Sequence, residues 1–149
     1  MLPRGDGDGW TYCALGHKHW GLFGAAGLLL WHRECVLLQH RALWSHHGGT
    51  WGLLGGARNR AESAEQAARR EAAEEAGLHA DAYEITGTYV DDHGGWSYTT
   101  VVGRAHDAAL PTGLTGETLE VRWVRADRLG ELPLHPGFAA TWETVRAIA

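Results

Sequence analysis

The chain alternates between short apolar runs and polar or glycine-rich stretches, a pattern that predicts several strands. The runs that carry it lie at residues 21–31, 35–40, 82–89, 96–102 and 117–124. The polar residues 32–34 predict a hairpin between the first two runs. Glycines inside the first run indicate places where another backbone approaches closely. Residues 46–52 are predicted to form a loop, whose last two residues begin the stretch 51–56.

One long segment has a different pattern and predicts a helix. Residues 61–76 contain no proline, glycine or β-branched residue, and alanine and glutamate dominate them. Such a composition strongly favours an α-helix. Either Ser63 or Asn59 would cap its start, and Gly77 stands where a left-handed residue would end it. A second, terminal helix is predicted at residues 138–148.

The order of these elements predicts the architecture. Strands, a helix, further strands and a last helix are typical of an α+β layered domain. A chain of 149 residues is long enough to bury a core, so we expect a single domain over residues 1–149. Residues 1–9, rich in glycine and aspartate, are expected to form a flexible terminus.

Three glutamates concentrate negative charge on the predicted helix. Glu71, Glu74 and Glu75 stand at positions i, i+3 and i+4, so their carboxylates are expected to share one face. Such crowding repels, and hard divalent cations such as Mg²⁺ favour carboxylate oxygens. The alternative is a solvated acidic helix face without any ligand.

The spacing around these glutamates decides between the two interpretations. Gly56 is followed after five residues by Glu62, and after seven more by the run Arg70-Glu-Ala-Ala-Glu-Glu-Ala-Gly-Leu78. This pattern resembles the Nudix box of the Nudix hydrolase family. The one departure is Ala72, where the family usually carries a larger aliphatic residue. The resemblance implies an α/β/α sandwich around a mixed β-sheet.

The resemblance also implies a chemistry. Nudix enzymes use Mg²⁺ or Mn²⁺ to hydrolyse nucleoside diphosphates linked to another group. By this likeness, the metal ligands are the carboxylates of Glu71, Glu74 and Glu75, with the backbone carbonyl of Gly56 as a further oxygen. A cation of this kind neutralises phosphate oxygens and lowers the pKa of bound water.

The predicted catalytic residues are Glu74, Glu117 and Arg70. Arg70 matches a position that pairs with Glu62 in the family and orients the loop against the helix. The general base comes from different places in different family members. Glu117 is the first choice for the base. Glu74 is the alternative if it is not fully occupied as a metal ligand, and Glu120 is interpreted as a charge at a strand edge.

Candidates for substrate binding are less specific. Arg41 and Arg58 are plausible phosphate contacts, because a guanidinium fork fits phosphate oxygens, but a surface role fits them equally. Trp96 could stack on a base or sugar, as could Trp44, Trp51 and Tyr98. Most of the eight tryptophans are expected in the core.

A second metal site is a weaker hypothesis. Cys13, His17 and His19 carry side chains that bind zinc, but a structural zinc site usually needs four ligands. Cys35 or His32 would be the fourth. The alternative is that no zinc site exists here.

Charge and composition limit the partners. The formal net charge is −5, which argues against binding a nucleic-acid polymer or an anionic membrane. Two cysteines suggest a reducing compartment without a disulfide framework, and no segment has the layout of a signal peptide or a membrane span. We therefore expect a cytoplasmic protein that acts on a small nucleotide. Exposed tryptophans would suit a homodimer interface, although nothing in the sequence establishes one.

The substrate is the most open point. The short chain most resembles the MutT type, which converts a nucleoside triphosphate, often an oxidised one, to monophosphate and pyrophosphate. An ADP-ribose or sugar-nucleotide pyrophosphatase is the alternative. The proline that the ADP-ribose branch carries after the box is absent from residues 91–95. A catalytically silent nucleotide sensor is a third hypothesis, but such modules usually lose box carboxylates, and none is lost here.

Overall fold

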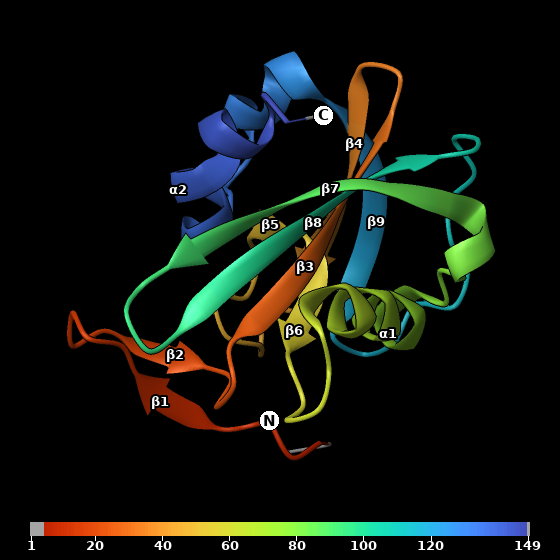
Figure 1. The fold of residues 1–149 in the computed structure, drawn as a ribbon. Helices are drawn as coiled ribbons and strands as arrows, with labels where there is room; N and C mark the ends of the chain where they lie inside the picture. The colour runs from red at the N-terminus through yellow and green to blue at the C-terminus, as the bar shows by residue number, and fades with distance from the viewer. Residues whose placement is uncertain (1–4, 149) are drawn as a thin grey trace.

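The computed structural model describes residues 5–148, which form a mixed β-sheet between two helices (Figure 1). The order of elements is β1 (Trp10–Tyr12), β2 (Lys18–Trp20), β3 (Ala25–His32), β4 (Cys35–Arg41), β5 (Trp51–Gly52), β6 (Leu54–Ala57), α1 (Ala64–Ala76), β7 (Tyr83–Asp92), β8 (Ser97–Ala105), β9 (Thr118–Arg125) and α2 (Pro136–Val145). Two short 3₁₀ turns, Ala80–Ala82 and Ala126–Glu131, join α1 to β7 and β9 to α2. This is the predicted α+β fold.

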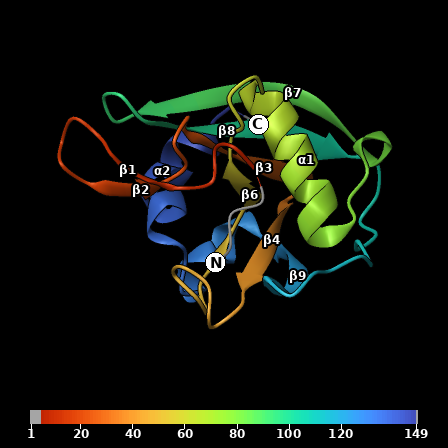
Figure 2. The same cartoon turned by 90° about the horizontal axis from the view of Figure 1, so that it is seen from below.

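The sheet is organised around β3. Its strand order is β5-β4-β3-β8-β7, with β6 paired to β3 and β9 paired to β4. β3 and β8 run parallel, whereas the other pairs in this sheet are antiparallel. A parallel pair needs a long crossover, and α1 lies in that connection. α1 and α2 lie on opposite sides of the sheet in both views (Figures 1 and 2).

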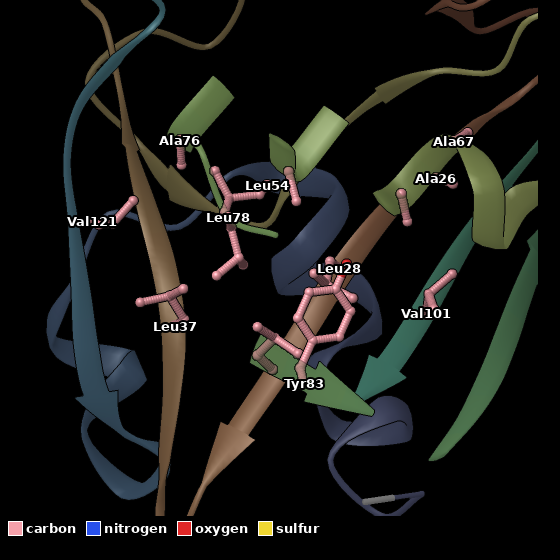
Figure 3. Packing of buried hydrophobic residues seen from close by; sticks show 13 residues of the cluster. Ala26, Leu28, Leu37, Leu54, Ala67, Ala76, Leu78, Tyr83, Val101 and Val121 are labelled. Atoms are coloured by element: carbon pink, nitrogen blue, oxygen red, sulfur yellow. The ribbon is translucent and has the colours of Figure 1, made fainter. Parts of the chain in front are cut away.

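Both faces of β3 are buried, which explains its nearly continuous apolar sequence. Leu28 and Leu30 belong to the cluster beneath α1, and Leu29 belongs to the cluster beneath α2. The α1 cluster is shown in Figure 3 and includes the alanines Ala67, Ala68, Ala72 and Ala76. Ala72 is fully buried there, so the small residue at this box position lets the helix pack closely on the sheet.

Helix α1 begins at Ala64, directly after one of the two predicted caps and three residues into the predicted stretch 61–76. Ser63 is the N-cap, with extended dihedral angles, and it forms a reciprocal capping box with Gln66. The other proposed cap, Asn59, therefore lies before the helix. Gly77 ends the helix in the left-handed conformation, as predicted, with φ of 69°. The terminal helix was misplaced, because His135 caps it and it ends at Val145.

The first predicted strand was too long. β3 starts at Ala25 because Gly21 and Gly24 have φ of 118° and 90°, values that break an extended strand. The short hairpin β1–β2 was not predicted. It forms its own two-stranded sheet, and it lies beside the turn between β7 and β8 (Figure 1).

Of the predicted flexible terminus, residues 1–9, the structure describes residues 5–9. Residues 1–4 lie outside the described part. Within the described part of this terminus, the carbonyl of Gly7 accepts a hydrogen bond from the amide of Leu22 at 2.8 Å. Within residues 5–148, no helix has the length and apolar character needed to span a membrane.

Candidate active site

Glu75 is the most deeply buried carboxylate of the predicted cluster. It is 2% exposed on the inner face of α1. One carboxylate oxygen accepts a hydrogen bond from the amide of Gly55 at 2.8 Å, and the other accepts one from Nε2 of Gln39 at 3.2 Å. Burial, and then the charge of Glu71, raises the pKa of Glu75 to about 8. The side chain is thus held in place but crowded by like charge.

Glu71 lies one turn earlier and shares the same buried face. It is 6% exposed, and its carboxylate lies against β6 at Gly56. A Cβ atom at Gly56 would stand 2.7 Å from Cδ of Glu71, so only glycine leaves room for this arrangement. The glycine that opens the box therefore has a steric reason beyond the bend predicted from sequence.

Arg70 connects the loop before the helix to the acidic face, as predicted. Its Nε and Nη2 donate to the two oxygens of Glu62 at 2.6 and 3.0 Å. Nη2 also donates to the carbonyl of Ala57 at 2.9 Å, and Nη1 donates to Glu71 at 2.9 Å and Glu74 at 3.2 Å. The hydrogen bond from Arg70 lowers the pKa of Glu62, and the same bond raises the pKa of Arg70.

Glu74 differs from its two neighbours. Its side chain is 41% exposed and pairs with Arg70 at 3.2 Å. It lines a small side cavity together with Asn59, Arg70 and Glu71, and it does not line the main cavity. Glu71 lines both cavities, and Glu75 lines the main one. Glu71 thus shares one cavity with Glu74 and the other with Glu75, and the assignment of Glu74 as ligand or base stays a prediction.

Glu71 and Glu75 open into a cavity of about 640 Å³, within the usual range for small-molecule sites. Glu117, the predicted base, lines the same cavity. Cations at its wall are Lys18 and Arg41. The remaining polar and aromatic lining residues include Trp10, Trp20, Trp44, Asp91, Tyr98 and several histidines. Glu120 pairs with Arg122 on β9, which agrees with a surface charge.

The predicted substrate contacts separate into two groups. Arg41 lines the cavity, and its Nε donates to the carbonyl of His46 at 3.0 Å. Arg58 does not line it and donates to the carbonyl of Glu62 at 2.9 Å. Trp96 is at the cavity wall but 9% exposed, and one face of its indole ring stacks on His19 at 3.8 Å. A base could therefore stack only on the other face.

Two residues that hold the site were missed from sequence. Gln39 is fully buried in β4 and donates both to Glu75 and to Oγ1 of Thr118, at 3.2 and 2.7 Å. Gly55 supplies the amide that anchors Glu75. A polar glutamine inside the apolar run 35–40 was the available signal for Gln39, because a buried polar side chain needs a partner.

The donor chemistry at Glu71, Glu75 and Gly56 fits a divalent cation such as Mg²⁺ or Mn²⁺. All three residues line the main cavity and offer hard oxygens, and burial, followed by the charge of Glu71, raises the pKa of Glu75. A cation between the two carboxylates would remove their mutual repulsion. Glu71, Glu75 and the carbonyl of Gly56 are therefore the residues that would hold it.

Comparisons with known proteins agree with this geometry. The NUDIX domain model matches residues 22–146. A relative from Mycobacterium tuberculosis, named "Putative 8-oxo-dGTP diphosphatase 3", is 51% identical over 96% of this chain and 70% of its own length. The chain therefore belongs to the Nudix hydrolase family. It is a MutT-like Nudix pyrophosphohydrolase.

Two further similarities support the family. The crystal structure of the Nudix hydrolase RenU from M. smegmatis has a TM-score of 0.85 and 48% identity, covering 95% of this chain and 94% of that chain. A "Nucleoside triphosphate pyrophosphatase/Nudix hydrolase fusion protein" from Bifidobacterium longum is 41% identical over 91% of this chain. That match covers only 30% of the fusion protein, so it concerns one part of it.

Proposed function

We propose that this protein hydrolyses a nucleoside triphosphate to the monophosphate and pyrophosphate, with Mg²⁺ or Mn²⁺ as cofactor. One observation carries the proposal: two buried carboxylates, Glu71 and Glu75, lie at the wall of a cavity of about 640 Å³ that also presents Arg41. A polyphosphate is negatively charged and is repelled by carboxylates. It can therefore bind next to Glu71 and Glu75 only when cations neutralise part of this charge.

A bound divalent ion would supply charge neutralisation at the phosphate oxygens and a more acidic water. The chain supplies the geometry. Gly55 and Gln39 fix the two oxygens of Glu75, and Arg70 fixes Glu71 through its Nη1 hydrogen bond. These contacts keep the carboxylates in place before substrate arrives, which is the preorganisation that phosphoryl transfer requires.

Glu117 is the proposed general base. It lines the same cavity as Glu71 and Glu75, whereas Glu74 faces the side cavity and pairs with Arg70. Glu117 would accept a proton from the attacking water as the water oxygen bonds to phosphorus. The phosphorus–oxygen bond of the anhydride then breaks and pyrophosphate leaves.

The proposed substrate is an oxidised purine nucleoside triphosphate. The name of the mycobacterial relative, 51% identical, specifies 8-oxo-dGTP as the substrate of that protein. In the present chain, Trp44 lines the cavity and is 63% exposed, so its ring is free to stack on a purine. Arg41 on the same cavity wall would meet the phosphates.

The test is metal-dependent product release across a nucleotide panel. The panel holds normal and 8-oxo-purine triphosphates, ADP-ribose, a sugar nucleotide and a dinucleoside polyphosphate, each with Mg²⁺, Mn²⁺ or EDTA. The Glu75→Gln variant is assayed alongside Glu65→Gln, which changes an exposed glutamate of the same helix paired with Arg69. Pyrophosphate release from an oxidised triphosphate, lost only in Glu75→Gln, is expected.

Other outcomes would redirect the proposal. Turnover of ADP-ribose or a sugar nucleotide in preference to triphosphates would replace the substrate while keeping the site. Nucleotide binding without turnover under any metal would favour a silent sensor. A cytoplasmic location and a homodimer stay predictions, and light scattering of the purified chain would test the latter.

A further inference from the structure

A second set of metal-binding side chains lies outside the acidic site. Cys13, His17, His19 and His93 each offer one ligand atom, and these atoms all lie within 4.8 Å of one another. Cys13 and His17 flank the turn between β1 and β2, and His19 is in β2. His93 comes from the turn between β7 and β8, far away in the sequence. Four donors converging from two separate segments match the ligand number of a structural zinc site.

Two buried ring nitrogens of this group are available to bind a metal. Nε2 of His19 and Nδ1 of His93 are buried and have no hydrogen-bond partner. A buried polar atom without a partner is costly and calls for an explanation.

A carboxylate orients one of these rings. Nε2 of His93 lies 2.8 Å from Oδ2 of Asp91, so this nitrogen donates a hydrogen bond to the carboxylate. In the tautomer that makes this bond, Nδ1 is the ring nitrogen that can bind a metal. Histidines that bind metal in proteins usually donate their other ring nitrogen to a carboxylate in this way. The Asp91–His93 contact thus has the form of a metal-site support and not only of a surface ion pair.

The backbone brings the two segments together without help from the ligand side chains. The amide of Ala14 donates to the carbonyl of Gly94 at 2.7 Å. A Cβ atom at Gly94 would stand 2.6 Å from Cβ of Ala14, so glycine permits this approach. Inside the hairpin, the amide of Cys13 donates to the carbonyl of His17 at 3.0 Å. The donor atoms are therefore placed before any metal arrives.

We propose that Cys13, His17, His19 and His93 bind one Zn²⁺ ion. One thiolate and three imidazoles in a compact set are the ligands that zinc favours in tetrahedral sites. Binding displaces the thiol proton of Cys13 to solvent. The structure corrects the sequence hypothesis on the fourth ligand, because Cys35 and His32 pair with each other in the β3–β4 hairpin instead.

The proposed zinc site is structural, because four protein ligands leave no open position for substrate. It joins the β1–β2 hairpin to the β7–β8 turn. His19, Asp91, His93 and Trp96 also line the main cavity, and His19 stacks on Trp96. Zinc would therefore fix one wall of the substrate cavity, while the reaction itself takes place at the acidic wall.

The experiment measures metal content and ligand identity in the full chain. Protein purified without chelator, then dialysed against limiting Zn²⁺, is analysed for zinc by mass spectrometry. Co²⁺ then replaces zinc, because a cobalt–thiolate bond gives an absorption band that carboxylate ligands cannot give. The variants are Cys13→Ser and His93→Gln, with Cys35→Ser, His79→Gln and Glu75→Gln as controls.

We expect one zinc ion per chain and a thiolate band with cobalt. Zinc affinity should fall by at least about tenfold in Cys13→Ser and His93→Gln and stay unchanged in the three controls. If Cys13→Ser does not fold, loss of zinc in folded His93→Gln carries the test. Absence of zinc binding at saturating metal, or full retention of zinc in His93→Gln, would overturn the proposal. Zinc loss confined to Glu75→Gln would also overturn it, because the ion would then belong to the acidic site.

Discussion

The carboxyl group of Glu71 occupies the space where a side chain at Gly56 would begin. A Cβ atom there would lie 2.7 Å from Cδ and 2.8 Å from Oε1 of Glu71. Real Cβ atoms do not approach so closely, so either the glutamate or strand β6 would have to move. The position of one proposed metal ligand is thus set by the absence of a side chain on the neighbouring strand.

Gly56→Ala should therefore reduce metal-dependent turnover by at least about tenfold, because a displacement of about 1 Å in a catalytic group is costly. The apparent Mg²⁺ affinity should weaken as well. Gly116→Ala is the matched control, since a Cβ there meets nothing within 4 Å. Steady-state kinetics at varied Mg²⁺ would measure both effects. Wild-type activity in Gly56→Ala would show that Glu71 need not stay where the structure places it.

The Arg70 network predicts that arginine cannot be replaced by lysine. Arg70 uses three nitrogens to hold Glu62, Glu71 and the carbonyl of Ala57 at once. A lysine ammonium cannot reproduce this planar fork. Arg70→Lys should lower the free energy of unfolding by about 1–3 kcal/mol and also reduce activity.

Arg69→Lys provides the control in the same helix turn. Arg69 pairs with Glu65 at 3.0 Å on an exposed face, so its replacement should change the free energy of unfolding by less than about 0.5 kcal/mol. Urea unfolding of both variants would make the comparison. Equal effects from the two substitutions would contradict a special role for Arg70.

The choice between two candidate bases can be decided by a pair of substitutions. Glu117→Gln should reduce kcat by about 10²–10⁴-fold, because the base is lost while the metal-binding carboxylates stay. Glu74→Gln should have a clearly smaller effect on kcat, because Glu74 faces the side cavity and not the main one. Single-turnover rates at saturating Mg²⁺ would separate chemistry from metal binding. The reverse order of effects would reassign the base to Glu74.

The raised pKa of Glu75 leads us to expect an unusual dependence of the free energy of unfolding on pH. In the folded chain without metal, burial and Glu71 raise its pKa to about 8, against an ordinary value of 4.5. Between these values the folded state holds a proton that the unfolded chain releases. The free energy of unfolding should therefore fall as pH rises from about 4.5 to about 8.

Glu75→Gln removes this titration while keeping the shape of the side chain. In EDTA, the variant should lose less stability than the wild type as pH rises from 5 to 8, although it should be inactive. Its amide also offers a donor to Oε1 of Gln39, which is buried and lacks a partner. Urea unfolding at several pH values would measure the difference. Parallel profiles for the two proteins would show that Glu75 titrates normally.

Local sequence predicted the box well because its contacts are local or fixed by motif spacing. The Arg70–Glu62 pair, the Ser63 cap and the left-handed Gly77 all follow from positions within one loop and one helix. The sequence left the helix start open between Ser63 and Asn59, and the structure selects Ser63. Propensity alone could not decide between them.

The rest of the site depends on contacts that no local pattern encodes. Gln39 meets Glu75 across 36 residues, and only the packing of α1 on β3 and β6 brings them together. His93 joins Cys13, His17 and His19 from a distant turn, whereas the sequence hypothesis considered Cys35 and His32 as the fourth residue of this group. Trp96 was predicted to stack on a base, but tertiary packing places His19 on one of its faces.

The last prediction concerns His135, which caps α2 at the edge of the cavity. Its Nδ1 accepts a hydrogen bond from the amide of Gly137 at 3.0 Å, a role that only the neutral ring can play. Burial, and then the charge of Arg41, lowers the pKa of His135 to about 4 from 6.5. Between about pH 4 and pH 6.5, the folded chain therefore binds less proton at His135 than the unfolded chain does. The associated stability is present above pH 6.5 and is lost as pH falls toward 4.

His135→Asn keeps a capping side chain but does not titrate. Relative to the wild type, its free energy of unfolding should change less between pH 7 and pH 4.5, with a difference on the order of 1 kcal/mol. His79→Asn is the control, because His79 precedes a 3₁₀ turn and makes no side-chain cap hydrogen bond. Urea unfolding in EDTA would compare the three proteins. If His135→Asn and His79→Asn show the same pH profile as the wild type, the cap does not depend on a neutral His135, and the charge of Arg41 does not act on it.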